Sequence, residues 1–184
     1  KNPTWREYEP QEDELVIEID PGRAFGTGTH PTTSLCIKLM EENIKEGNTV
    51  IDVGTGSGIL MVAAEKLGAG KIVGTDIDPM AVEVAEENLL LNKVDMKKAK
   101  AYAGDLVTVV QNEKFDVVVA NILADVLLIL LKDISRVVKK DGLVIFSGII
   151  EDKLEEMKRA VEGVGLEILE VKADKEWRAM LMRA

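Results

Sequence analysis

Glycine and polar residues follow four successive apolar runs of this sequence, in a pattern that suits the binding of a nucleoside. They are Gly54, Gly56, Gly58, Asp76, Asp105 and Asn121. The three glycines let the backbone turn sharply and approach a ligand without interference from Cβ atoms. Asp76 stands where a carboxylate can accept hydrogen bonds from both hydroxyls of a ribose. Core packing has no use for such residues at these positions, so we expect them to share one binding site.

The spacing of the glycines restricts which nucleoside derivative this site can take. The dinucleotide fingerprint needs G-x-G-x-x-G, but Ile59 follows Gly58 directly and the loop reads G-x-G-x-G. The pair Gly70-Lys71 lacks both the first glycine and the hydroxyl of a phosphate-binding P-loop. S-adenosylmethionine, which has a ribose and an adenine but no pyrophosphate, is the natural candidate.

The elements around the glycines read as strand, turn and helix. Val50 to Val53 form a β-branched run typical of a buried strand, and a helix is expected from Ile59 to about Leu67. The first amides of this helix face the turn, so we expect the loop to offer unpaired N–H donors to a carboxylate or phosphate. The next strand, Lys71 to Thr75, brings Asp76 beside the turn.

Strands and helices alternate along the rest of the chain. Further helices are expected at Pro31–Asn43, Pro79–Leu91, Leu123–Val138 and Glu151–Val161, and further strands at Leu15–Ile19, Lys100–Ala103, Phe115–Ala120, Leu143–Ser147, Leu166–Val171 and Glu176–Met182. This alternation predicts an α/β fold with a parallel sheet covered on both faces, and the closing strand pair predicts an antiparallel edge. In such a sheet a ligand lies over the carboxyl ends of the strands, where the strand order reverses.

Composition limits the class of protein. A length of 184 residues with 46% hydrophobic content fits one globular domain, which we expect at residues 14–184 after a lead-in or linker at residues 1–13. The start at Lys1 instead of Met fits a fragment of a longer protein. The net charge of −10 argues against a direct grip on nucleic acid and suits a basic protein partner.

The sequence gives little support for a metal site, a disulfide or a membrane span. One histidine, His30, and one cysteine, Cys36, argue against a zinc site and exclude an internal disulfide. The most apolar region, Phe115 to Leu131, is interrupted by charged and polar residues and predicts a core strand and a core helix instead of a membrane span. A cytoplasmic protein is therefore expected.

Several stretches of the sequence resemble the PrmA family, whose members methylate the eleventh protein of the large ribosomal subunit. They are Asp20-Pro-Gly22, Phe25-Gly-Thr-Gly28-Thr-His-Pro-Thr-Thr33, Gly54-Thr-Gly-Ser-Gly58, Gly74-Thr-Asp76-Ile-Asp78-Pro79, Asn121-Ile-Leu-Ala124 and Glu176-Trp177. The resemblance covers nearly the whole chain, and its second and fifth stretches are far more specific than the glycine turn. It implies a class I methyltransferase fold: a Rossmann-like three-layer sandwich with a mostly parallel seven-stranded sheet.

The resemblance also implies the chemistry. S-adenosylmethionine would donate methyl groups to the α-amine and lysine ε-amines of that ribosomal protein. By position, Thr33, Gly54, Asp76 and Asn121 match the family's cofactor contacts. Family members also carry a small amino-terminal domain that grips the ribosomal protein, for which this chain shows no counterpart.

The residues independently suggest how an amine could be methylated. The nitrogen must be neutral and in line with the methyl–sulfur bond. We expect Asn121 to accept a hydrogen bond from the amine through its amide oxygen, aided by backbone carbonyls at Ile122-Leu123, and Asp105 to meet the adenine amino group. His30 is expected to be a loop or cap residue and not a catalyst, and Trp177 a packing residue.

Two other functions remain open at this stage. One is a class I methyltransferase with a different acceptor, such as a small molecule, a glutamine or an adenine. The last two usually show N-P-P-[YF] after the fourth strand, whereas this chain has Asn121-Ile-Leu-Ala. The other is a nucleotide-binding module without methyl transfer, which Ile59 in place of the third fingerprint glycine disfavours.

Overall fold

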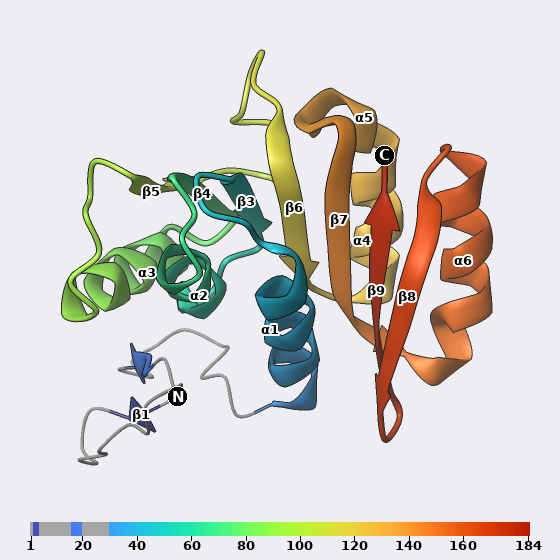
Figure 1. Cartoon of the computed structure of the whole chain (residues 1–184), viewed down its shortest axis with the longest axis horizontal. Coiled ribbons are helices and arrows are strands. Elements are labelled where there is room, and N and C mark those ends of the chain that lie inside the picture. Colours follow the sequence, from blue (N-terminus) through green and yellow to red (C-terminus); the bar gives the residue numbers. More distant parts are fainter. Residues whose placement is uncertain (1, 4–15, 20–29) are drawn as a thin grey trace.

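The structure is a computed structural model that describes residues 2–3, 16–19 and 30–184. In this part of the chain, seven strands form one sheet in the order β5-β4-β3-β6-β7-β9-β8 (Figure 1). The strands are β3 (Thr49–Val53), β4 (Lys71–Asp76), β5 (Ala99–Ala103), β6 (Phe115–Asn121), β7 (Val138–Ile150), β8 (Glu167–Asp174) and β9 (Trp177–Arg183). β9 runs antiparallel to both of its neighbours, and the other pairs are parallel. The predicted mostly parallel sheet is confirmed.

Helices cover both faces of this sheet. They are α1 (Pro31–Asn43), α2 (Ile59–Lys66), α3 (Pro79–Leu91), α4 (Ala124–Leu130), α5 (Ile134–Val137) and α6 (Leu154–Gly163). The first three lie on one face and the last three on the other (Figure 1). Each face buries its own apolar cluster because neighbouring residues of a strand point to opposite sides. The predicted three-layer α/β architecture is therefore confirmed.

The helix starts follow from proline and side-chain caps. α1 and α3 both begin at a proline, which suits the first helical position because that N–H has no intrahelical partner. The Asp78 carboxylate accepts a hydrogen bond from the Met80 N–H at 2.9 Å, and His30 caps α1 in the same way. The predicted bounds of both helices match the observed ones.

Several elements differ from the sequence prediction. The helix expected at Glu151–Val161 begins with a 3₁₀ turn at Glu151–Lys153, and the strand expected at Leu166–Val171 is observed at Glu167–Asp174. The helix expected at Leu123–Val138 is broken by a 3₁₀ turn at Leu131–Asp133. β7 begins earlier than expected, at Val138, and contains an irregular stretch in which Asp141 has a positive φ. The strand expected at Leu15–Ile19 is described from residue 16, where only Glu18–Ile19 is strand, paired with Asn2–Pro3 and not with the main sheet.

The described residues 16–19 are tied to the end of α3 by Asn92. Its amide oxygen accepts from the Glu18 N–H at 2.8 Å, and its amide nitrogen donates to the Glu18 carbonyl at 2.7 Å. The expected turn Asp20–Gly22 and most of the second glycine loop lie outside the described residues. None of the described helices has the length and apolar character that a bilayer crossing requires.

The third glycine of the loop is explained by packing between α2 and α3. Gly58 is the N-cap of α2 with φ +81, a conformation that costs other residues free energy. A Cβ atom at this position would lie 2.9 Å from the Ala85 Cα of α3. Because that neighbour is backbone, α3 would have to shift to make room.

We therefore expect Gly58→Ala to lower the free energy of unfolding by roughly 2–4 kcal/mol, from left-handed strain and overpacking together. Gly163→Ala is the matched control, because a Cβ atom there meets nothing within 4 Å and its φ is ordinary. Urea titration followed by circular dichroism measures both variants. Equal stability of the two would contradict this explanation of Gly58.

Candidate functional site

A cavity of about 680 Å³ opens over the carboxyl ends of the parallel strands. It lies where the strand order reverses, because β4 and β5 extend the sheet on one side of β3 and β6 and β7 on the other. Six of the seven predicted site residues line it: Thr33, Gly54, Gly56, Asp76, Asp105 and Asn121. Gly58 does not line the cavity.

The end of β4 holds the glycine loop through three consecutive backbone N–H groups. The Thr75 carbonyl accepts from the N–H groups of Gly54 and Thr55, each at 2.8 Å. The Asp76 Oδ2 atom accepts from the Gly56 N–H at 2.9 Å, while Oδ1 accepts from the Asp78 N–H at 3.0 Å. The predicted proximity of Asp76 to the loop is confirmed.

This clamp corrects the expectation of unpaired donors for the N–H groups of the loop itself, while the expectation for the first amides of α2 stays a prediction. The N–H groups of Gly54, Thr55 and Gly56 are bonded to β4, and the Gly58 N–H donates to the Thr55 carbonyl at 2.9 Å. Backbone amides buried in a tight turn need partners, and the neighbouring strand supplies them. Each Asp76 oxygen keeps a second lone pair that can accept a hydrogen bond from a ligand hydroxyl.

The turn after β6 packs directly on the glycine loop. A Cβ atom at Gly54 would lie 2.6 Å from the Ile122 Cγ2 atom. Glycine at this position therefore lets the end of β6 approach the end of β3. Both ends then contribute to one cavity wall.

Asn121 is oriented by Thr33 across the cavity. Its amide nitrogen donates to the Thr33 Oγ1 atom at 3.2 Å, which leaves the amide oxygen as an acceptor. The start of α1 is fixed in turn by Ser147, whose buried hydroxyl donates to the Thr32 carbonyl at 2.6 Å. The sequence stretches around Thr33 and Asn121 are therefore joined in space.

Gly148 is a site residue that the sequence prediction missed. It lines the cavity with φ +85, and a Cβ atom there would lie 3.1 Å from the Asn121 Oδ1 atom and 2.7 Å from the Ile122 carbonyl oxygen. The missing side chain keeps space in front of two acceptor oxygens. The signal was an isolated glycine at the end of a strand pattern, which marks a bulge or a close backbone approach.

His30 and Trp177 form another part of the cavity wall. The Nδ1 atom of His30 lies 2.8 Å from the Thr32 Oγ1 atom and caps α1, as expected from the sequence. Its ring meets the Trp177 ring edge-on, with centroids 5.2 Å apart and planes at 67°. Trp177 therefore packs at the wall of the cavity, where it can also contact a ligand.

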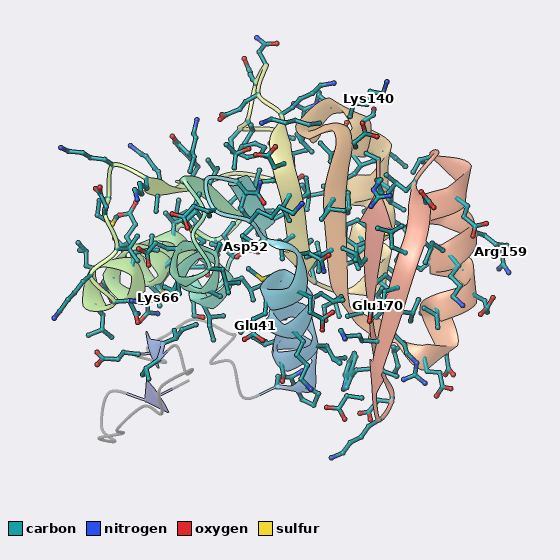
Figure 2. The ribbon with its side chains drawn as sticks, viewed as in Figure 1. Glu41, Asp52, Lys66, Lys140, Arg159 and Glu170 are labelled. Atoms are coloured by element: carbon teal, nitrogen blue, oxygen red, sulfur yellow. The ribbon has the colours of Figure 1, made fainter. Side chains whose placement is uncertain are left out.

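Asp52 is a second residue that the sequence prediction missed. It is 1% exposed, in the middle of β3, and neither carboxyl oxygen makes a hydrogen bond of normal geometry with the described residues. Figure 2 shows it within the sheet, whereas Lys140 and Arg159 extend from the periphery. Burial raises the pKa of Asp52 to about 7; the nearby Thr55 hydroxyl offsets part of this rise, and the negative charge of Asp76 adds to it.

The fold and the cavity at its switch point are those of a class I methyltransferase. The family model described as "Ribosomal protein L11 methyltransferase (PrmA)" matches residues 2–184, and the chain belongs to this family. It is 60% identical over 181 residues to a ribosomal protein L11 methyltransferase of Fusobacterium nucleatum, covering 98% of this chain and 58% of that protein. The corresponding protein of Alkaliphilus oremlandii is 49% identical over 98% of this chain and 57% of its own length.

A solved structure supports the same assignment. The crystal structure of the ribosomal protein L11 methylase from Lactobacillus delbrueckii subsp. bulgaricus matches with a TM-score of 0.91 and 38% sequence identity. The match covers 98% of this chain and 91% of that one. The chain spans somewhat more than half the length of the curated relatives that it matches.

The buried Asp52 predicts how stability depends on pH. Between the ordinary aspartate pKa and the raised value, the folded state binds one more proton than the unfolded state, so stability falls as pH rises through this window. Asp52→Asn removes this loss. We expect its unfolding free energy, relative to the unsubstituted protein, to rise by about 3 kcal/mol from pH 5 to pH 8.

Asp141→Asn is the matched control. Asp141 is exposed near the start of β7, at the end of the strands opposite to the cavity, and has a positive φ that asparagine tolerates. Denaturant titrations at both pH values measure all three proteins. A stability difference that stays constant between the two pH values would contradict the raised pKa of Asp52.

Proposed function

We propose that this chain binds S-adenosylmethionine and transfers its methyl group to amino groups of ribosomal protein L11, at the N-terminal α-amine and at lysine ε-amines. The observation that carries the proposal is the cavity itself. It combines the Asp76 carboxylate, held against the Gly56 N–H, with the Asn121 amide, held by Thr33. The names of the curated relatives and membership in the family support the acceptor.

The curated relatives are longer, and this chain matches 58% or less of their length. We assign residues 14–184 to the catalytic domain and leave residues 1–13 as its lead-in. The net charge of −10 favours approach of a basic protein over approach of nucleic acid.

The cavity suits the proposed cofactor in size and in polar groups. Small-molecule sites span roughly 300–1,000 Å³, a range that includes this one. Asp76 has acceptor capacity for the ribose hydroxyls, and Asp105 lies on the same wall for the adenine amino group. Thr55 and Thr75 also line the cavity, although their hydroxyl oxygens are buried away from it.

When bound, S-adenosylmethionine supplies an electrophilic methyl group on a sulfonium. The chain must then hold a neutral amine in line with it. Deprotonating a lysine at neutral pH costs roughly 4–5 kcal/mol, and an α-amine only about 1–1.5 kcal/mol, so the α-amine is the easier acceptor. Asn121 Oδ1 and the Ile122 carbonyl face the space kept open by Gly148, where they can accept hydrogen bonds from the amine and aim its lone pair.

No side-chain general base is required by this proposal. Acceptor oxygens orient the nitrogen, and partial desolvation in an apolar cavity disfavours the ammonium form. Exposed apolar residues at the cavity mouth, Leu123 and Ile129, can provide this desolvation when the substrate covers them. A different acceptor remains the alternative, but Asn121-Ile-Leu-Ala lacks the N-P-P-[YF] pattern usual for glutamine or adenine.

Asp76→Ala is expected to weaken S-adenosylmethionine binding by about tenfold or more, because it removes both a ribose acceptor and the partner of the Gly56 N–H. Calorimetric titration measures the affinity. Gly163→Ala serves as a control outside the cavity. Unchanged affinity in Asp76→Ala would count against the ribose assignment.

Transfer of radiolabelled methyl from S-adenosylmethionine to purified ribosomal protein L11 tests the acceptor. Label on L11, located by mass spectrometry at amino groups, is the expected result. We expect Asn121→Ala to reduce the rate by about 100-fold, because it loses the acceptor oxygen, while Asn121→Asp keeps an oxygen and part of the activity. Cofactor binding without methylation of L11, or label on another class of molecule, would overturn the proposed acceptor.

A further inference from the structure

The proposed reaction leaves the buried Asp52 without a role. Its Cα pairs across the sheet with those of Gly74 and Val119, so it lies at the centre of the face covered by α1 and α2. Gly74 has no side chain, and the space beside it is taken by Met61 and Thr55. A Cβ atom at Gly74 would meet the Met61 Sδ atom first and would lie 3.2 Å from the Thr55 Cβ atom. Asp52 stands two residues before Gly54, and the Thr55 hydroxyl acts on its carboxyl. Gly54 and Thr55 line the cavity and form the part of its floor next to Asp52.

The Thr55 hydroxyl offsets only part of the cost of ionising this carboxyl. α1 presents Leu35 and Leu39 to the core, and the buried residues of α2 are all apolar. The neighbouring strands contribute glycine and valine, and the one described charge that acts on Asp52 is the negative charge of Asp76. A buried carboxyl without a partner costs free energy, so its presence beneath the ligand site calls for an explanation.

The charge of the proposed cofactor explains why a carboxyl is buried here. The sulfonium donor carries one more positive charge than the thioether that remains after methyl transfer. A negative charge in a medium of low polarity attracts the donor and gives the product no equivalent gain. This step rests on the proposed function.

We propose that Asp52 is a specificity-determining residue that favours the cationic sulfonium donor over its neutral thioether product. It acts through the cavity floor, without direct contact with the cofactor. Its effect adds to those of Asp76 and Asp105, which line the cavity and also bear carboxyl groups. Preferential release of the product would then follow directly from the loss of the positive charge.

The ionisation of Asp52 and the binding of the donor affect each other by the same free energy. If the ionised carboxyl favours the donor, donor binding must favour ionisation and release a proton from Asp52. The pKa of Asp52, raised to about 7, places this exchange near neutral pH. The preference for donor over product should therefore increase as pH rises through neutrality.

Calorimetry with S-adenosylmethionine and S-adenosylhomocysteine as probes tests the proposal at about pH 6 and about pH 8.5. The ratio of product to donor dissociation constants should rise about fivefold or more between these pH values in the unsubstituted protein. In Asp52→Asn the ratio should change less than about twofold and stay below the unsubstituted value at the higher pH. Asp141→Asn, which removes an exposed carboxylate near the start of β7, at the end of the strands opposite to the cavity, should behave like the unsubstituted protein.

A second measurement needs no variant. Titrations near neutral pH in buffers of different ionisation enthalpy should show proton release on binding of the donor and less on binding of the product. Equal proton release for both, or an Asp52→Asn ratio with the unsubstituted pH dependence, would overturn this inference while leaving the proposed function intact. Failure to bind either compound would overturn both.

Discussion

The hydrogen bond between the Asp76 carboxylate and the Gly56 N–H is the contact on which the cavity depends. It joins the end of β4 to the loop after β3, and the Thr75 carbonyl adds two further bonds to the same loop. With these three N–H groups satisfied, the loop can stay in a left-handed, close-packed path. The consequence is a carboxylate held in place before any ligand arrives, which lowers the cost of ordering it on binding.

The end of β6 can pack close to the loop after β3 because Gly54 and Gly148 have no side chains. Gly54 lets Ile122 pack on the loop, and Gly148 leaves space in front of Asn121. The Ser147 hydroxyl then fixes the start of α1, so that Thr33 orients the Asn121 amide. The two hydrogen bonds, between residues 115 and 88 positions apart in sequence, thus help to set the geometry around the end of β6.

Much of this arrangement could be predicted because its signals are local. Prolines and caps mark the starts of α1 and α3, and polar residues after apolar runs mark the strand ends. The break between α4 and α5 and the early start of β7 depend on tertiary packing, which periodicity does not report. The pairing of the loop amides was missed because their partners lie on β4. The sequence pattern of the loop does not show which strand lies next to it. Asp52 was missed although an acidic residue among Val50, Ile51 and Val53 is itself a signal.

The central claim is that this cavity binds a sulfonium nucleoside and not a dinucleotide. Calorimetric titration of the chain with S-adenosylmethionine and, separately, with NAD tests this claim most directly. The account predicts saturable one-to-one binding of S-adenosylmethionine and no comparable binding of NAD. Tighter binding of NAD, or no binding of S-adenosylmethionine, would contradict it.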